Sequence, residues 1–529
     1  MGLWSYYFFL KFFLYAGKFI GFHFWPNLAF GIFVALPFRH VALRALKQAI
    51  AIPAGIALLY YDSWLPPFSR ALSQAGEIEQ FSAQYLVELA GRFINPKVVT
   101  ILALMLVLHL LLSRKLRMST FAFIAILIMP WWFSLTSLSL RAAAAPQANA
   151  AQVASSSTPL EIGGPADDAG LSQALTGFYA KESGRKVDFP STAGSQAPFD
   201  IIFIHICSLA WDDLAYIDQR DNPLIKRFDV LFNNFDSAAS YSGPAAIRLL
   251  RAPCGQEPHA DLYKPAPAGC TLFDDLQNAG FTANWAMNHD GHFGGFIADV
   301  RDRGGMPATF TEDKGADISL RAFDGTPIYD DYSILSRWFE HRKTEAAPEV
   351  ALYYNTITMH DGNVKPGVNL GNPHDSYATR FKKFAGDISR FMDLLQSSGR
   401  RAVVVFVPEH GANVRGDRMQ ISGLREIPSP AVALIPVGIK LIGFPSGTGI
   451  QGQQQINAPS SFLALSQLLS NFMAKDPFTM ATPDLSDYIH NLPQTDFVAE
   501  NEATIVMRWG NVYKLRNPDK TWSDYITEP

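Results

Sequence analysis

The chain has 529 residues and a formal net charge of −4; 48% of its residues are hydrophobic, but only 17% are charged. In soluble domains, about a quarter of all residues are ordinarily charged. This composition excludes intrinsic disorder and a disulfide-dense miniature scaffold, and the slightly acidic balance offers no basic surface for nucleic acid. The low charged fraction indicates an average over two unlike parts, one of them in lipid.

The apolar residues are concentrated in five runs near the start of the chain. The runs are Tyr6–Phe22, Pro26–Phe38, Leu43–Leu65, Val98–Leu112 and Phe121–Leu138. Several are near the lower limit of roughly 17 residues for a spanning helix, so the first two could instead form one interfacial helix and one span. No clear small-residue cleavage site follows the first run, which argues against a signal peptide. We therefore predict a multi-pass α-helical membrane domain over residues 1–140.

Two of the links between these runs are basic, which indicates a cytoplasmic side. Their charged residues are Arg39, Arg44 and Lys47 after the second run, and Arg114, Lys115 and Arg117 after the fourth. Five spans with a cytoplasmic N-terminus, or four with a periplasmic one, both place the chain after Leu138 outside the cytoplasm. The sequence therefore predicts that the large C-terminal part is exported.

The pattern changes twice after the last apolar run. Residues 141–168 are rich in Ala, Ser, Pro and Gly and predict a flexible linker, and residues 169–529 alternate predicted strands with predicted helices. The strands are expected at Pro198–Ile206, Phe228–Phe235, Val350–Ile357, Arg401–Val407 and Val437–Phe444, and helices at Leu171–Glu182, Ser376–Ser397 and Ser460–Ala474. This alternation favours an α/β domain with a largely parallel sheet between helices. Ligands of such sheets bind beyond the carboxyl ends of the strands.

The chain has three cysteines. Cys254 and Cys270 flank a Pro/Gly-rich loop and are a credible disulfide pair in an exported domain. Closing a loop of about 15 residues is worth roughly 3 kcal/mol in the chain-entropy model. Cys207 is left over at the carboxyl end of the first predicted strand. A small buried apolar side chain is the commonest role of a free cysteine, but an odd thiol at a strand end is also a candidate functional group.

A second candidate lies in VVVFVPEHGA, where a buried strand is expected to end at Pro408. Glu409 and His410 follow, and then Gly411. Adjacent residues of a regular strand point to opposite faces, but the flanking Pro and Gly release the backbone, so both side chains could converge. An acidic residue and a histidine can bind zinc through oxygen and nitrogen. The alternative is a solvated Glu-His turn.

A third candidate is Ser242 in SYSGPAAIRLL, near the predicted start of a helix. Backbone N–H groups favour an anion there, although a simple N-cap serine would have the same sequence. Cys207, Glu409 and His410 together offer sulfur, oxygen and nitrogen ligands for zinc, with a fourth position for Ser242 or a substrate. Zinc would lower the pKa of a bound hydroxyl, an arrangement expected for covalent phosphoryl transfer.

Four histidines and one arginine are weaker candidates. His360 in TITMHDG and Arg418 in RGDRMQ could neutralise a leaving alkoxide or hold a phosphate oxygen. A structural hydrogen bond explains either residue equally well. His205 lies within a predicted strand, which favours a core role, and His289 and His292 lie in a Gly-rich loop that could line a polar cleft.

Five motifs carry a resemblance to a known family: HICSLAWDD, SYSGPAAIRLLRAPCGQ, FDGTPIYDD, VPEHGA and GDRMQISGLREIPSP. Together with the membrane helices and the linker, they resemble the phosphoethanolamine transferases of the alkaline phosphatase superfamily, and most closely the bacterial cellulose phosphoethanolamine transferases. The resemblance runs over essentially the whole chain. It implies an inner-membrane protein whose catalytic domain lies in the periplasm and has the alkaline phosphatase and sulfatase-like α/β fold.

The resemblance also implies roles for individual residues. Ser242 would be the nucleophile and would complete a zinc site made by Cys207, Glu409 and His410. Pocket residues that would bind the substrate are Tyr241, His360 and Arg418. Relatives that modify lipopolysaccharide have Glu, Thr and an Asp-His pair at the positions of the metal and nucleophile residues. Those departures argue for cellulose, and against lipid A, as the acceptor.

The implied reaction moves phosphoethanolamine from phosphatidylethanolamine to glucose 6-hydroxyls of nascent cellulose. The implied partners are the cellulose synthase complex and its small membrane accessory subunits. One alternative is another membrane phosphotransferase, sulfotransferase or hydrolase of the superfamily. A type I sulfatase would need C-x-P-x-R, whereas Cys207 is followed by SLAW. The other alternative is a non-catalytic scaffold that recruits the synthase.

Overall fold

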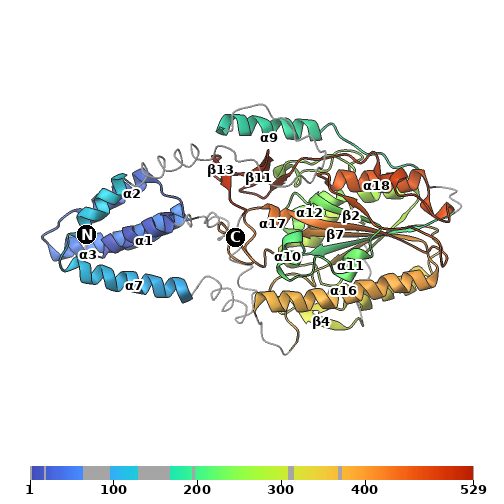
Figure 1. Ribbon diagram of the computed structural model, residues 1–529, viewed down its shortest axis with the longest axis horizontal. Helices are drawn as coiled ribbons and strands as arrows, with labels where there is room; N and C mark the ends of the chain where they lie inside the picture. Colours follow the sequence, from blue (N-terminus) through green and yellow to red (C-terminus); the bar gives the residue numbers. More distant parts are fainter. Residues whose placement is uncertain are drawn as a thin grey trace, which may run out of the picture. The chain divides into compact units, whose positions relative to one another are not determined.

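The computed structural model describes residues 3–16, 20–63, 96–128, 167–192, 197–307, 315–366 and 372–527. The chain divides into two compact units, a helical unit at its N-terminal end and an α/β unit at its C-terminal end (Figure 1). The linker predicted over residues 141–168 lies outside the described residues, except for Asp167 and Asp168. Asp167 caps the first helix of the α/β unit by accepting a hydrogen bond from the Gly170 N–H, and Asp168 begins that helix.

The N-terminal unit consists of apolar helices that coincide with the predicted runs. They are α1 (Trp4–Ala16), α2 (Phe24–Ala35), α3 (Val41–Asp62), α7 (Pro96–Ser113) and an apolar helix over Met118–Ile128. Aromatic and aliphatic side chains from α1, α2, α3 and the last of these helices form its core, among them Phe8, Phe30, Leu58 and Ile126.

Among the described residues, α3 is the one helix long and apolar enough to cross a membrane. The described apolar segments Phe24–Ala35, Thr100–Ser113 and Met118–Ile128 are shorter, and residues 129–138 of the fifth predicted run lie outside the described residues. The five-span topology therefore stays a prediction. One detail of it was wrong: Arg44 and Lys47 belong to the first turns of α3, whereas only Arg39 lies in the link before that helix.

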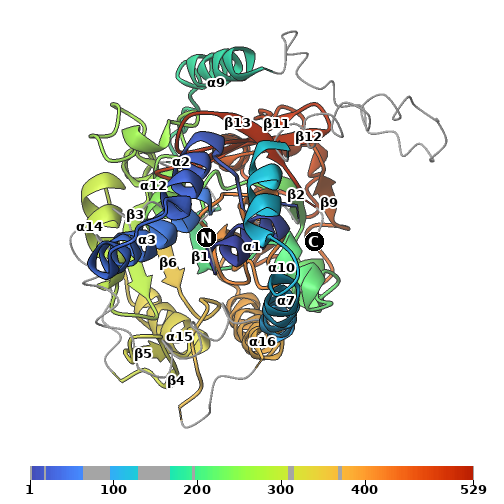
Figure 2. The same cartoon turned by 90° about the vertical axis from the view of Figure 1, so that its left-hand side faces the viewer.

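The α/β unit is built on a seven-stranded sheet in the order β3-β6-β1-β7-β8-β2-β9. In Figure 2, β3 lies toward one edge and β9 toward the other. The strands are β1 (Asp200–Cys207), β2 (Val230–Asp236), β3 (Thr282–Met287), β6 (Val350–Thr356), β7 (Ala402–His410), β8 (Leu434–Ile442) and β9 (Gln454–Ile456). Each of the five strands predicted from sequence is present, with boundaries that differ by a few residues.

The sheet is largely parallel, as the sequence predicted, and a single antiparallel strand makes it mixed. The strands β3, β6, β1 and β7 run parallel, but β8 is antiparallel to both β7 and β2. The reason is the connection: residues 411–433 leave the carboxyl end of β7 and return directly into β8 without crossing the sheet. A parallel neighbour would need a crossover to the opposite edge. The antiparallel return keeps this long loop at the carboxyl end of β7.

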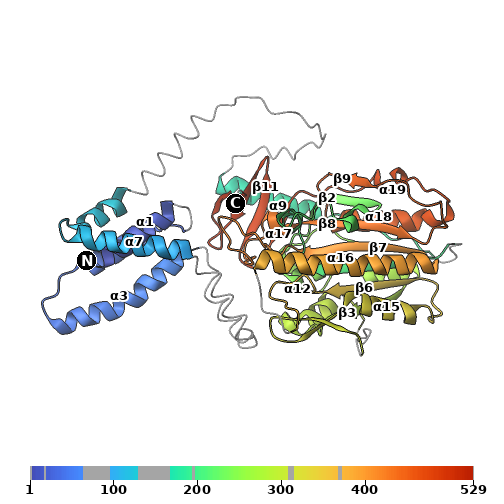
Figure 3. The same cartoon turned by 60° about the horizontal axis from the view of Figure 1, so that its bottom comes forward.

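Helices cover both faces of the sheet, as predicted. Figures 1 and 3 show α18 and α16 on its opposite sides. One face packs against α12 (Ser242–Leu250), α13 (Leu272–Ala279) and α18 (Phe462–Ala474), and the other against α10 (Trp211–Tyr216), α11 (Pro223–Lys226), α15 (Asp331–Arg342) and α16 (Pro373–Ser398). The central strands are buried on both faces, which explains their continuous β-branched and aromatic runs.

Smaller elements complete the unit. A four-stranded antiparallel sheet near the C-terminus consists of β10 (Val498–Glu500), β11 (Ile505–Trp509), β12 (Val512–Arg516) and β13 (Trp522–Tyr525), and α9 (Asp168–Glu182) packs against it. The sequence did not predict this sheet. Other elements include the hairpin β4 (Ile318–Arg321) and β5 (Pro327–Tyr329), and the short helices α14 (Phe296–Ala298), α17 (Pro430–Ala433) and α19 (Ser486–Ile489).

Candidate active site

Three elements bring the candidate residues together at the carboxyl ends of the central strands. Cys207 ends β1, Glu409 and His410 end β7, and Ser242 begins α12. Ligand atoms of Cys207, Glu409 and His410 all lie within 4.8 Å of one another, and all three side chains are buried. The Ser242 hydroxyl donates to the Cys207 Sγ over 3.3 Å.

An irregularity in the pairing of β1 with β7 explains why neighbouring side chains converge. Ile206 pairs with Pro408, but Cys207 pairs with His410, so Glu409 is an extra residue in β7. A bulge of this kind bends the strand and re-aims its side chains. The prediction that the strand ends at Pro408 was wrong, since β7 continues to His410. The proline is tolerated because β8 pairs with β7 only as far as Phe406.

The cluster has the donor set and the unpaired atoms that a zinc ion requires. The His410 Nδ1 lies 2.9 Å from the Gly411 carbonyl oxygen, so Nδ1 carries the proton and Nε2 keeps a lone pair. That Nε2 and the Glu409 Oε2 are buried and have no hydrogen-bond partner among the described residues. Sulfur, nitrogen and oxygen donors suit zinc. Unpaired buried polar atoms are rare and call for an explanation, and a bound cation supplies one.

The electrostatics of the cluster point the same way. Burial, followed by the charge of the Glu409 carboxylate, raises the pKa of the Cys207 thiol to about 12. Burial also raises the pKa of Glu409, although polar groups of Ser242 and Asn355 offset part of this effect. Without a cation, the Cys207 thiol therefore favours its neutral form, and burial disfavours the charged form of Glu409. Burial, and after it the positive charge of Arg425, lowers the pKa of His410 well below its usual value. Its imidazole therefore stays neutral and can bind a metal ion.

A relay of buried side chains holds Glu409 in place. The Asn355 Nδ2 donates to the Glu409 Oε1 over 2.7 Å, and the Asn355 Oδ1 lies 2.7 Å from the His289 Nε2. The Gly291 N–H donates to the His289 Nδ1, so Nε2 must be the protonated nitrogen that donates to Asn355. Such outer hydrogen bonds fix the orientation of metal ligands. The Gly-rich loop that contains His289 therefore supports the site, whereas His292 is exposed.

Arg425 is the arginine that the structure brings to the cluster. Its Nη1 donates to the Ser208 Oγ over 3.0 Å, and its guanidinium lies 5.8 Å from the centre of the Tyr241 ring. The same Nη1 lies 3.5 Å from the His410 Nδ1, and the charge of Arg425 lowers the pKa of Cys207 and of His410. Arg418, which the sequence favoured, is exposed on the same loop.

The loop folds back on itself, which separates these two arginines. The Gly423 N–H donates to the Asn413 carbonyl, and the Asn413 side chain donates to the Leu424 carbonyl over 2.7 Å. These bonds return residues 423–425 to the end of β7. Both arginines lie in the block GDRMQISGLREIPSP, and no local pattern distinguishes them.

The remaining predicted residues lie near the cluster with different partners. The Tyr241 hydroxyl donates to Glu426, whose backbone follows Arg425. The His360 Nδ1 donates to the Asp361 carbonyl over 2.6 Å. Burial lowers the pKa of His360 to about 4, with Arg425 as the next cause, so its imidazole is neutral at pH 7. The His205 Nδ1 lies 2.9 Å from the Tyr353 hydroxyl, inside the core as expected.

Comparison with known proteins identifies the family. The family described as the C-terminal domain of the cellulose biosynthesis protein BcsG matches residues 156–522, and the family of its N-terminal domain matches residues 4–131. The cellulose biosynthesis protein BcsG of Escherichia coli K12 is 39% identical over 542 residues, covering 99% of this chain and 96% of that protein. The chain belongs to the BcsG family.

Two solved structures share a similarity with this BcsG family member. A protein of the alkaline phosphatase superfamily from Vibrio parahaemolyticus aligns with a TM-score of 0.46 and 12% identity, covering 67% of this chain and 87% of that one. The periplasmic domain of EptC from Escherichia coli, in complex with zinc, aligns with a TM-score of 0.44 and 14% identity, covering 65% and 97%. The assignment to the BcsG family depends on the family matches and the full-length relative.

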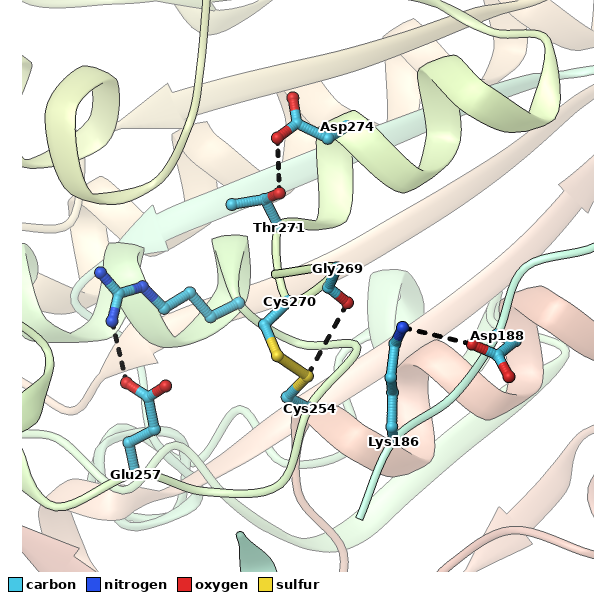
Figure 4. Close-up of a disulfide and its surroundings, with 9 residues drawn as sticks. Lys186, Asp188, Cys254, Glu257, Gly269, Cys270, Thr271 and Asp274 are labelled. Carbon is cyan, nitrogen blue, oxygen red and sulfur yellow. Dashed lines mark hydrogen bonds and ion pairs between the residues drawn. A yellow bond between two sulfur atoms is a disulfide. The ribbon is translucent and has the colours of Figure 1, made fainter. Parts of the chain in front are cut away.

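The predicted disulfide of this BcsG family member is confirmed. Cys254 and Cys270 are bonded, with their Cα atoms 5.3 Å apart (Figure 4). Cys254 follows α12 closely, and the loop that it closes is also held by an ion pair between the Arg251 Nη1 and the Glu257 Oε2 at 2.8 Å. The disulfide therefore anchors the segment after the helix that presents Ser242.

Proposed function

We propose that this protein is a zinc-dependent phosphoethanolamine transferase that moves phosphoethanolamine from phosphatidylethanolamine to glucose 6-hydroxyls of cellulose. One observation carries the proposal: the Ser242 hydroxyl lies 3.3 Å from the Cys207 Sγ, beside a buried Glu409 oxygen and a His410 nitrogen that lack hydrogen-bond partners among the described residues. Membership of a cellulose biosynthesis family supports cellulose as the acceptor.

The residues of the cluster suit a bound zinc ion. Cys207, Glu409 and His410 would hold it, with the Ser242 Oγ alongside. When bound, zinc would stabilise the charge that develops on the serine oxygen and on the phosphoryl group. The Asn355 side chain keeps Glu409 in a fixed orientation, and the Gly411 carbonyl does the same for His410.

In the first half-reaction, the Ser242 Oγ attacks the phosphorus of the donor lipid. An Oγ–P bond forms and the P–O bond to diacylglycerol breaks, so that the serine proton is lost and the leaving diacylglycerol oxygen gains one. The first turn of α12 directs backbone N–H groups toward a phosphate. Arg425, held by Ser208, would neutralise the negative phosphoryl oxygens.

In the second half-reaction, a glucose 6-hydroxyl attacks the phosphoserine intermediate. The new bond joins the glucose O6 to phosphorus, the Oγ–P bond breaks, and Ser242 regains its proton. The same groups serve both halves because the two transition states carry their charge at the same place.

The N-terminal unit would hold the catalytic unit at the inner membrane. The apolar helices, of which α3 is long enough to span, confine the enzyme to the surface that contains its lipid donor. We infer that this unit is multi-pass and that the catalytic unit lies in the periplasm, where the Cys254–Cys270 disulfide would persist. The cellulose synthase complex and its small membrane subunits are the expected partners.

Substitution of the nucleophile tests the proposal. In cells that make cellulose, Ser242→Ala should abolish phosphoethanolamine on cellulose, as measured by solid-state NMR, while the protein stays folded and inserted. Ser237→Ala is the matched control, because Ser237 is a buried serine shortly before the same helix and its hydroxyl donates, among the described residues, to the Ala239 carbonyl alone. Modified cellulose in the Ser242→Ala strain would contradict the proposal and favour a scaffold role.

A further inference from the structure

An acidic side chain packs against the first turn of the helix that presents the nucleophile. A Cβ atom placed on Gly243 would lie 2.5 Å from the Asp299 Oδ2. Asp299 begins the short helical turn η3 (Asp299–Arg303), which follows α14. The carboxylate therefore touches the backbone of the residue next to Ser242, and it can do so only because residue 243 has no side chain.

Asp299 makes no direct polar contact through its side chain within the described part of the protein. Its carboxylate has no hydrogen bond or ion pair with any described residue. The neighbouring arginines are engaged elsewhere, since Arg301 pairs with Asp302 at 2.7 Å and the Arg303 guanidinium donates to the Tyr263 carbonyl. Burial raises the pKa of Asp299, and the charge of Arg303 opposes this effect. A partly buried carboxylate beside a nucleophile thus has no ion-pair partner among the described residues, although the charge of Arg303 acts on it without direct contact.

Charges of opposite sign flank the nucleophile. The Arg425 guanidinium lies over the ring of Tyr241, the residue before Ser242, and the Asp299 carboxylate contacts Gly243, the residue after it. A phosphoryl group at Ser242 suits the arginine and the helix N-terminus. A cationic group attached to that phosphoryl group would suit the carboxylate.

We propose that Asp299 binds the ammonium of the ethanolamine head group and thereby selects the donor lipid. This assignment depends on the proposed function. Phosphoethanolamine is a zwitterion with its ammonium two carbons from the phosphate ester oxygen, so one end would meet Arg425 while the other meets Asp299. A phosphoglycerol head group has no cation, and a trimethylammonium group has no N–H to donate. Asp299 is therefore a specificity residue, and it does not take part in bond making.

The test uses the full-length protein in vesicles of phosphatidylethanolamine, phosphatidylglycerol or phosphatidylcholine. The readout is the mass of the Ser242 peptide, followed over time. We expect Asp299→Asn to slow formation of the phosphoethanolamine adduct by roughly ten- to hundredfold, the effect of losing one charge-assisted bond. Formation of any phosphoglycerol adduct should not slow. Asp302→Asn is the matched control, because Asp302 lies on the same turn but pairs with Arg301 at the surface.

The outcomes separate this assignment from the proposed function. An unchanged ratio of adducts in Asp299→Asn would overturn the assignment, and so would an equal fall with every lipid, because the residue would then act on the nucleophile alone. If the unsubstituted protein forms no adduct with phosphatidylethanolamine, the proposed function itself fails and the assignment fails with it.

Discussion

Two buried polar clusters, one in each unit, differ in how their groups are paired. In the N-terminal unit, Lys11 forms an ion pair with Asp62 and donates to the Asn27 Oδ1 over 2.6 Å. Asn27 and His23 in turn bind the two oxygens of Asp62, each at 2.7 Å. In the α/β unit, the Glu409 Oε2 and the His410 Nε2 lie 3.8 Å apart and are buried without a hydrogen-bond partner among the described residues.

The difference separates a structural role from a chemical one. A network in which each charge has a partner joins the elements that contribute to it, and in the N-terminal unit these are α1, α2 and α3. A buried cluster with open ligand atoms is destabilising unless something binds to it. We therefore expect the first cluster to affect assembly of the helices and the second to affect metal content and catalysis.

The largest effect should follow loss of a metal ligand. The full-length protein should contain about one zinc per chain, and His410→Ala should lose both the zinc and all transfer activity. Elemental analysis of the purified protein measures the first, and adduct formation on Ser242 measures the second. His374→Ala is the matched control, because His374 lies near the surface of α16 and pairs with Asp375. Full zinc occupancy in His410→Ala would show that His410 is not a metal ligand. The α/β cluster would then no longer differ from the N-terminal one by binding a metal.

The next effect concerns Arg425, which lies beside the open cluster, that is, Cys207, Glu409 and His410 with their unpaired ligand atoms. Arg425→Ala should lower the rate of adduct formation by about 10²- to 10³-fold, as expected when a preorganised donor to a developing charge is removed. Zinc content should be unchanged. Arg418→Ala is the comparison, since Arg418 is exposed on the same loop. A larger loss with Arg418→Ala than with Arg425→Ala would return Arg418 to the pocket that the sequence predicted.

Breaking the paired cluster should cost stability and leave the chemistry intact. Lys11→Met removes the cationic partner of the buried Asp62 carboxylate. Loss of one partner of a buried ion pair lowers the free energy of unfolding by about 3–5 kcal/mol. Chemical unfolding of the protein in detergent measures this cost. The double change Lys11→Met with Asp62→Asn should recover part of the loss, and Lys47→Met, at the Leu36 carbonyl, should cost little. Loss of zinc in Lys11→Met would mean that the two clusters are not independent.

The smallest effect should come from the disulfide. Cys254→Ser with Cys270→Ser removes the constraint on a loop whose ends are 16 residues apart, which is worth about 3 kcal/mol. Adduct formation at low temperature should be nearly unchanged, because neither cysteine belongs to the open cluster. Thermal unfolding followed by circular dichroism measures the loss of stability, and the mass of the Ser242 peptide measures adduct formation. A loss of zinc at low temperature would show that the disulfide helps to form the metal site.

The sequence predicted the grouping of the site because its residues lie at the ends of recognisable elements. Cys207 and His410 follow apolar runs that become adjacent strands, and Ser242 precedes a Gly-Pro helix start. Strand ends of a parallel sheet meet at one edge, so a local pattern is enough to bring Cys207 and His410 together.

The sequence missed features that long loops or sheet pairing decide. It did not single out Arg425, whose position beside the cluster depends on a loop that folds back through Asn413. The extension of β7 past Pro408 depended on the register of β1 and on the early end of β8. None of these features has a signature in the flanking residues, because each depends on a contact with a distant segment.

The most direct test of the central claim is mass spectrometry of the full-length, zinc-loaded protein after incubation with vesicles of phosphatidylethanolamine. We predict a phosphoethanolamine group on Ser242, formed with release of diacylglycerol and absent in His410→Ala. A folded, zinc-loaded protein that acquires no adduct, or that acquires it on a residue other than Ser242, would contradict the claim that the open cluster exists to activate this serine.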